Sequence, residues 1–291
     1  MIEAVGFTDQ TGSVNPSAHS STSTSQLQLS RRCALFTWVA MSVSIGTGLL
    51  AWGPIGSPSE SHVFAAHGVD VLLSLPMLLA GVWGWHALAR SHWPETMQVP
   101  WRWCFGSIAL SVGLSLICHW VPGDLSRLAE QAATAAASVL LLCGFLAERV
   151  DARWGSRRTC FIAIAAVTLA GVASWFNVLL LGQMDLRPLL LLLWWPTLLV
   201  PSGALSLHAS HTTTRDWQLI LGLWATAQLF DLGDSAVMGF TGGALSGHAL
   251  MHLCLAGAAA WLGYRASTVA SVACDDDAVL TQANTSLNTS G

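Results

Sequence analysis

The sequence predicts an all-α, polytopic membrane protein, and three observations lead to this fold class. Of the 291 residues, 53% are hydrophobic and only 10% are charged, whereas a soluble domain carries about 25% charge. The apolar residues gather in repeated runs of about 20 residues, which is the length of a helix that spans a bilayer. The strands of a membrane barrel would instead alternate apolar and polar residues over about 10 positions, and these runs do not alternate.

Breaks between the apolar runs define eight expected spans. Gly53 ends the first run, Pro94 and Pro100 are expected to break the chain between the second and third, and Pro122 turns it between the third and fourth. The expected spans are 33–53, 70–90, 103–121, 126–148, 159–181, 186–206, 216–234 and 246–266.

The two ends of the chain differ in composition from the apolar middle. Residues 1–30 are rich in Ser, Thr and Gln, so we expect a disordered N-terminal tail on the cytoplasmic side. Residues 31–266 form the expected transmembrane helical domain. Residues 267–291 include three consecutive aspartates and are expected to form a disordered C-terminal tail.

The arginines predict the orientation of these spans. All twelve basic residues are arginine, and with the N-terminus in the cytoplasm ten lie on the inner side and only Arg127 and Arg187 on the outer side. Because cytoplasmic loops are enriched in basic residues, this bias favours eight spans in a cell membrane with both termini cytoplasmic. No basic cluster is dense enough to indicate a nucleic-acid partner.

Five polar residues with regular spacing are the candidate functional site. Ser115 and His119 are four residues apart, Glu130 lies eleven residues further on, and His248 and His252 are again four apart. Residues four apart share one face of a helix, and ionisable groups in hydrocarbon usually line an interior site. Three imidazoles are enough to hold a catalytic zinc with one open position.

The predicted orientation brings these five residues to one depth. Ser115 and His119 lie near the outer end of the third span, Glu130 near the start of the fourth, and both C-terminal histidines near the start of the eighth. We therefore expect the site to lie toward the outer leaflet. The alternative for any one intramembrane histidine is a hydrogen bond to a neighbouring helix.

Other polar residues lie at the same expected depth. Ser246 is the expected N-cap of the last span. Asp231, Asp234 and Arg187 lie at the outer ends of their spans. We expect these three residues either to contact the ligand residues and hold them in place or to form ion pairs.

At these residues the chain resembles the CREST superfamily of membrane hydrolases, which contains the alkaline ceramidases and PAQR-related proteins, and in particular its bacterial alkaline-ceramidase-like members. The shared pattern is Ser-x3-His, an acidic residue eleven positions beyond, and His-x3-His near the C-terminus. The likeness covers roughly residues 31–266, and it implies a seven-helix ceramidase-like core plus one extra N-terminal span. Further similar segments begin at Gly53, Asp70, Glu148, Asp185 and Phe240.

The resemblance implies a zinc-dependent hydrolase of the bacterial inner membrane that cleaves a lipid amide such as a ceramide. His119, His248 and His252 would bind Zn2+, and Ser115 would hold the oxyanion or a ligand. The acidic residue would activate water. The family has aspartate where this chain has Glu130, whose side chain is one methylene longer.

Two other functions compete with the hydrolase. A helix bundle that binds or senses a membrane lipid without turnover is favoured by the change from aspartate to Glu130. A metal or proton transporter would need polar residues continuing toward the inner leaflet, where the fourth span offers only Thr134 and Ser138. The sequence predicts neither the substrate head group nor the oligomeric state.

Overall fold

The computed structural model describes residues 67–91, 93–121, 123–182, 184–207 and 211–288, with a few helical positions between 36 and 51. The expected N-terminal tail and most of the expected first span, 33–53, lie outside the described residues. The described elements are α2 (His67–Ala89), α3 (Glu95–Trp120), α4 (Asp124–Arg149), η1 (Ala152–Gly155), α5 (Arg157–Leu181), α6 (Arg187–Ser206), α7 (Thr214–Leu232), α8 (Asp234–Phe240) and α9 (Gly247–Asn288).

The predicted all-α class is confirmed for the part of the chain that the structure describes, in which every regular element is a helix. Each of the seven expected apolar segments after residue 66 corresponds to one of the long helices. Four helices, α2 to α5, are long and apolar enough to cross a membrane, and they indicate a membrane protein. The count of eight spans stays a prediction.

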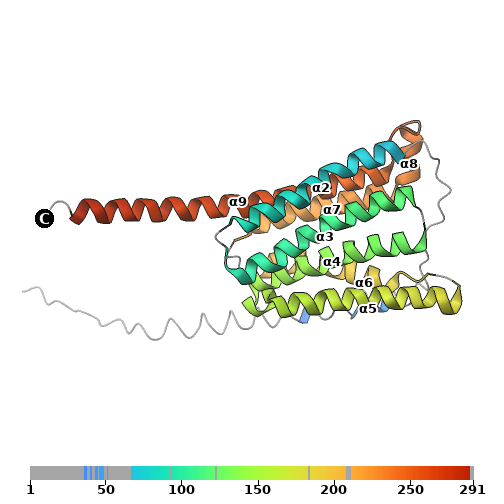
Figure 1. Cartoon of the computed structure of the whole chain (residues 1–291), viewed down its shortest axis with the longest axis horizontal. Coiled ribbons are helices and arrows are strands. Elements are labelled where there is room, and N and C mark those ends of the chain that lie inside the picture. The colour runs from blue at the N-terminus through green and yellow to red at the C-terminus, as the bar shows by residue number, and fades with distance from the viewer. Residues whose placement is uncertain are drawn as a thin grey trace, which may run out of the picture.

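Six helices form a closed ring. In order around the ring, α2 packs against α3, α3 against α4, α4 against α6, α6 against α7, α7 against α9, and α9 against α2. The helix α5 lies outside the ring against α4 and α6 (Figure 1). Many large apolar side chains of α5 are exposed, including Phe161, Leu169 and Leu180, as expected for a helix that faces lipid.

The start of α3 differs from the prediction. We expected Pro100 to break the chain, but α3 begins at Glu95 and Pro100 is buried inside it. A proline in a helix leaves the carbonyl four residues earlier without its usual partner. That carbonyl belongs to Thr96 and lies directly against Gly155 of η1, where any Cβ would clash with it. Close packing of η1 therefore accommodates the proline.

The last helix is longer than the expected eighth span. It begins at Gly247, close to the predicted start, and continues to Asn288. Figure 1 shows that the C-terminal part of α9 projects beyond the bundle, through the segment for which the sequence predicts a disordered tail.

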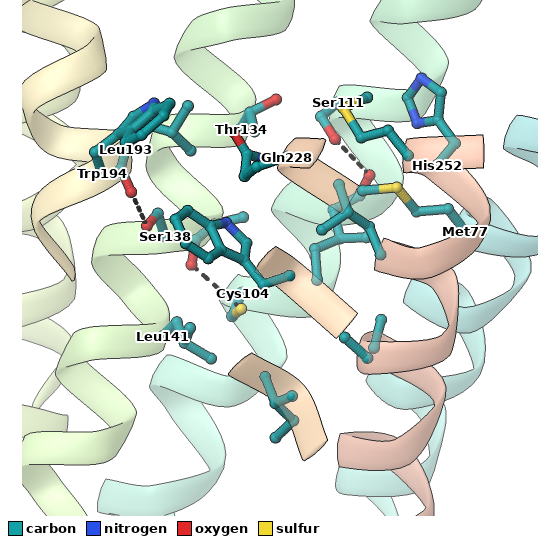
Figure 2. A pocket seen from close by; sticks show the side chains of 18 of the residues that line it. Met77, Cys104, Ser111, Thr134, Ser138, Leu141, Leu193, Trp194, Gln228 and His252 are labelled. Carbon is teal, nitrogen blue, oxygen red and sulfur yellow. Dashed lines mark hydrogen bonds between the residues drawn. The ribbon is translucent and has the colours of Figure 1, made fainter. Parts of the chain in front are cut away.

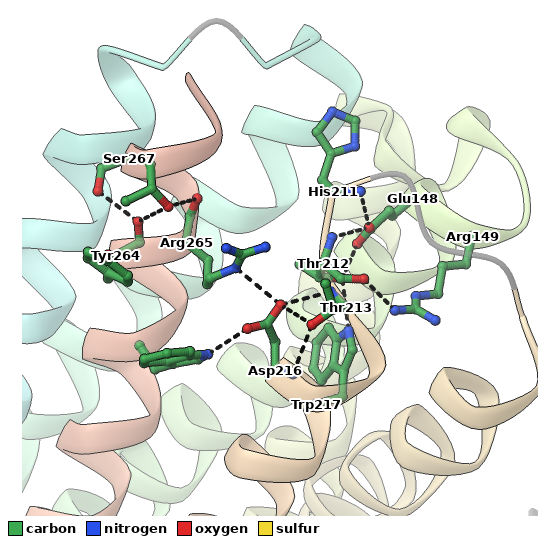
Figure 3. A network of polar contacts seen from close by, with 12 residues as sticks. Glu148, Arg149, His211, Thr212, Thr213, Asp216, Trp217, Tyr264, Arg265 and Ser267 are labelled. Carbon is green, nitrogen blue, oxygen red and sulfur yellow. Dashed lines mark hydrogen bonds and ion pairs between the residues drawn. The ribbon is translucent and has the colours of Figure 1, made fainter. Parts of the chain in front are cut away.

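Hydrogen bonds at the end of α4 fix the loop between α6 and α7. The carboxylate of Glu148 accepts bonds from the backbone N–H and the hydroxyl of Thr212, both at 2.6 Å. Arg149 is only 5% exposed and donates to the carbonyls of Leu207 and Thr212, at 2.8 and 2.7 Å (Figure 3). We call the Glu148–Arg149 contacts with this loop, together with Asp216 and its partners, the arginine network.

Asp216 extends the arginine network from α7 to α9. It accepts hydrogen bonds from the hydroxyl of Thr213, at 2.7 Å, and from the indole N–H of Trp261, at 3.0 Å. Its second partner on α9 is Arg265, at 3.1 Å. The carboxylate is buried, so these donors compensate for the loss of water.

Candidate functional site

The candidate site lies at the other end of the bundle from the arginine network. Five chain segments meet there: the start of α2, the end of α3, the start of α4, the turn between α7 and α8, and the start of α9. The two C-terminal histidines lie in the first two turns of α9. We call this region the histidine end.

The imidazoles of His248 and His252 face each other. Their Nε2 atoms are 3.2 Å apart, and the rings are nearly perpendicular with centroids 4.7 Å apart. His252 is 5% exposed, and its Nδ1 is buried with no hydrogen-bond partner among the described residues. The spacing of four residues thus brings the two nitrogens together, as the sequence predicted.

Both acidic residues near the end of α7 hold His248. The Nδ1 atom of His248 lies 3.1 Å from a carboxylate oxygen of Asp231. The backbone N–H of His248 donates to Asp234 at 3.1 Å. Because Asp231 engages Nδ1, the remaining ring nitrogen, Nε2, is the one that would bind a ligand in place of its hydrogen bond to Nε2 of His252. The sequence left two roles open for Asp231 and Asp234, namely support of a histidine ligand or formation of an ion pair. The structure favours the first role, because both carboxylates contact His248.

Arg187 instead forms an ion pair, which is the second role that the sequence left open. Its guanidinium forms a close pair with Asp185, two residues earlier in the chain, with a shortest separation of 2.8 Å. The same carboxylate accepts the backbone N–H of Arg187 at 3.1 Å. This local pair organises the start of α6.

The first turn of α9 is anchored on three sides. The hydroxyl of Ser246 accepts the backbone N–H of Ala249 at 2.9 Å, which confirms the predicted N-cap. The same hydroxyl donates to the buried carboxylate of Asp70 on α2. Gly247 packs so closely on α7 that a Cβ would clash with the carbonyl oxygen of Phe230. These contacts fix the direction in which His248 projects.

Of the remaining predicted residues, Glu130 lines the same pocket as the two histidines, whereas Ser115 and His119 are not among the described residues that line it. His119 interacts electrostatically with His252, and Glu130 with His248. Ser115 is buried on α3, one turn from His119. The side chain of Glu130 makes no hydrogen bond to another residue that the structure describes, so its carboxylate is available to a ligand.

The histidine pair suits a zinc ion. Two nitrogens bound to one tetrahedral zinc at 2.0–2.1 Å lie roughly 3.3 Å apart, close to the observed 3.2 Å between the Nε2 atoms of His248 and His252. A carboxylate on the other nitrogen of a ligand histidine, as at Asp231, is typical of zinc sites. Within the described residues, no set of three or more His, Cys, Asp or Glu side chains is already arranged around one point. The pair supplies two ligands, and the third from His119 stays a prediction.

A pocket of about 300 Å³ opens below the histidines inside the ring of helices. Glu130, Asp231, His248 and His252 line one part of it. The rest is mainly apolar and is contributed by all six ring helices (Figure 2). The sequence predicted the polar group at the histidine end but not the apolar space beside it, because the ring closes only through tertiary packing.

Comparison of the chain with family models, with curated proteins and with solved structures finds no match. The resemblance to the ceramidase superfamily therefore stays a prediction, supported by the residues named above.

Proposed function

We propose that this chain is an integral membrane, zinc-dependent hydrolase that cleaves a lipid amide such as a ceramide. The observation that carries the proposal is the facing pair of Nε2 atoms, on His248 and His252, at the mouth of an apolar pocket. An uncommitted carboxylate, Glu130, lines the same pocket. Hydrolysis of a lipid amide requires a base beside a metal-binding group and a space for a hydrocarbon chain. The pocket offers both.

Three histidines would hold the metal: His248 and His252 from α9, with His119 from α3. When bound, zinc would supply a Lewis acid that polarises a carbonyl and lowers the pKa of bound water to about 7. Asp231 fixes the ring orientation of His248 and keeps Nε2 directed at the other histidine.

Two side chains of the protein would transfer the proton of the attacking water and stabilise the oxyanion. Glu130 would accept a proton from water and pass it to the nitrogen of the leaving amine. Ser115 shares a face of α3 with His119 and with Ser111, which lines the pocket. From that face, its hydroxyl would donate a hydrogen bond to the developing oxyanion.

The orientation follows from the arginines. Eight spans with cytoplasmic termini place ten arginines inside, and the histidine end then lies toward the outer leaflet of the bacterial inner membrane. A lipid would reach the pocket from that leaflet.

Turnover of a labelled ceramide by protein purified in detergent tests the reaction. We expect the wild type to release fatty acid, and Glu130→Ala to lower kcat by about 10²–10⁴-fold because the base is lost. Glu95→Ala is the matched control, since Glu95 lies in an exposed ion pair with Arg157 and should keep full activity. Equal rates for wild type and Glu130→Ala would contradict the proposal.

Metal analysis tests the site separately. We expect wild-type protein to carry one zinc per chain and His248→Ala to lose it, because one of the two facing nitrogens is removed. His86→Ala changes an exposed histidine of α2 and should retain the metal. Full zinc content in His248→Ala would show that the site is wrongly assigned.

A lipid-binding protein without turnover is the second candidate. It is favoured by the mainly apolar pocket together with the lack, among the described residues, of a preformed three-ligand group. In this case the purified protein would retain a labelled ceramide without cleaving it, and Glu130→Ala would not change the amount retained.

A further inference from the structure

The pocket wall changes character with depth. Along α7 its lining residues share one face: Asp231 beside His248, then Gln228, then Trp224, and finally Trp217 at the far end. Along α4 the order is similar, from Glu130 through Gln131 and Thr134 to Leu141. We call Gln131, Thr134 and Gln228 the polar collar, since they lie between the charged mouth and the apolar base.

The hydroxyl groups that line the pocket are already used. Thr134 donates to the carbonyl of Glu130 at 3.0 Å, and Ser138 donates to that of Leu193 at 2.7 Å. Ser111 donates to the carbonyl of Ile108 at 2.9 Å (Figure 2). Each of these hydroxyls therefore already donates its single proton to a backbone carbonyl.

The two amides of the polar collar differ from the hydroxyls. Neither Gln228 nor Gln131 makes a side-chain hydrogen bond to any residue that the structure describes. Both are half-buried and line the pocket. Neither amide is fully buried, so both remain accessible to a polar group of a ligand in the pocket. Gln228, with Trp224 one turn below it, has the surroundings of a side chain that binds a polar group on a ligand.

The depth of Gln228 fixes where on the ligand that group lies. Gln228 is one helical turn deeper than Asp231, which touches His248. One turn rises about 5.4 Å, which corresponds to roughly four carbons of an extended chain. A chain that has its carbonyl at the histidines would bring its third to fifth carbons beside the collar.

We propose that Gln228, assisted by Gln131, binds a hydroxyl group near the carbonyl end of the acyl chain, so that the site selects N-acyl lipids with a hydroxylated acyl chain. This inference depends on the proposed hydrolase for the position of the carbonyl. The amide oxygen of Gln228 would accept the hydroxyl proton, and its N–H would donate to the hydroxyl oxygen. Deeper in the pocket, Ile220 and Leu262 offer such a hydroxyl no partner.

Three ceramides of equal acyl length test the inference by turnover: unsubstituted, hydroxylated on the third acyl carbon, and hydroxylated near the chain end. We expect wild-type kcat/KM to be about 5- to 10-fold higher for the 3-hydroxy lipid than for the unsubstituted one, the size of one net hydrogen bond. Gln228→Leu should abolish that preference, so that the ratio of kcat/KM between the two lipids falls to about one. The chain-end hydroxyl should bring no advantage.

Gln218→Leu is the matched control, because it makes the same change on an exposed position of α7 outside the pocket and should keep the preference. A wild type that treats all three lipids equally would overturn the inference. So would a preference that persists in Gln228→Leu.

Binding of the free fatty acids, measured by isothermal titration, separates this inference from the hydrolase proposal. We expect the 3-hydroxy acid to bind wild-type protein about 5- to 10-fold more tightly than the unsubstituted acid, and Gln228→Leu to bind both equally. If no ceramide is cleaved but this binding preference is present, the hydrolase is wrong and the selectivity of the collar stands. If ceramides are cleaved without any preference, the hydrolase stands and the proposed selectivity of the collar is wrong.

Discussion

Both ends of the helix bundle hold ionisable side chains, but they use them differently. In the arginine network, Glu148, Arg149 and Asp216 are occupied by loop backbone, hydroxyls and indole N–H groups (Figure 3). At the histidine end, Glu130 makes no side-chain hydrogen bond to a described residue, and Nδ1 of His252 is buried without a partner.

This difference separates structural from functional polar groups. Buried polar groups in a folded protein are normally hydrogen-bonded, so a network in which each charged side chain has partners stabilises the fold, although the Nε atom of Arg149 is itself buried without a partner among the described residues. Groups that are left unpaired around a pocket are expected to find partners in a ligand. Substitutions at the arginine network should therefore change stability, whereas substitutions at the histidine end should change binding and turnover.

The largest effect on folding is expected for Arg149→Met. The change removes the donors to the carbonyls of Ala204, Leu207 and Thr212. Breaking such a buried charged contact destabilises a protein by about 3–5 kcal/mol, which thermal unfolding in detergent would measure. The zinc content per folded molecule should not change.

Arg153→Met is the control for this experiment, because Arg153 is exposed in η1 and should contribute less than about 0.5 kcal/mol. Equal stability of the two variants would mean that the arginine network does not hold the fold. Loss of zinc from folded Arg149→Met protein would mean that the two ends are not independent.

An intermediate effect is expected for Gly247→Ala, which should lower both the stability of the fold and the affinity for zinc. The added methyl would clash with the carbonyl of Phe230, so α9 must shift and carry His248 away from Asp231. Overpacking of this kind costs about 1–3 kcal/mol, and zinc affinity should fall as well. Thermal unfolding and metal titration measure the two effects.

Gly257→Ala provides the comparison within the same helix. A Cβ at this position meets only Leu223, at 3.6 Å, and replacing a helical glycine by alanine is favourable by roughly 0.5–1 kcal/mol. We expect Gly257→Ala to be as stable as the wild type or more so. If the two glycine variants behave alike, the close approach at Gly247 does not position the site.

The helices could be predicted from the sequence because each is a continuous apolar run. The start of α3 could not, because the contact that accommodates Pro100 comes from Gly155, more than fifty residues away. The short helix α8 has too few residues to show a period. The arginine network was also missed, since Arg149 binds backbone carbonyls and no side-chain motif marks them.

The site was partly predictable for a related reason. The pairing of His248 with His252 follows from helical spacing alone, and the structure confirms that the two rings meet. The contact of Asp231 with His248 depends on how α7 packs against α9, so the sequence left it open. Gln228 carries no motif, and only the pocket lining shows its importance.

The smallest effect on folding, and the sharpest separation of binding from stability, is expected for Asp231→Asn. Asp231 is 46% exposed at its side chain, so unfolding should change by less than about 0.5 kcal/mol. The amide keeps the shape but lacks the charge that orients the imidazole of His248. Loss of such a carboxylate typically lowers metal affinity by about 10–100-fold, and competition with a zinc chelator would measure it. Asp124→Asn alters another exposed aspartate, at the start of α4, and should leave the affinity unchanged. If Asp231→Asn instead unfolds the protein while its zinc affinity persists, the carboxylate belongs with the structural groups, and the division between the two ends fails.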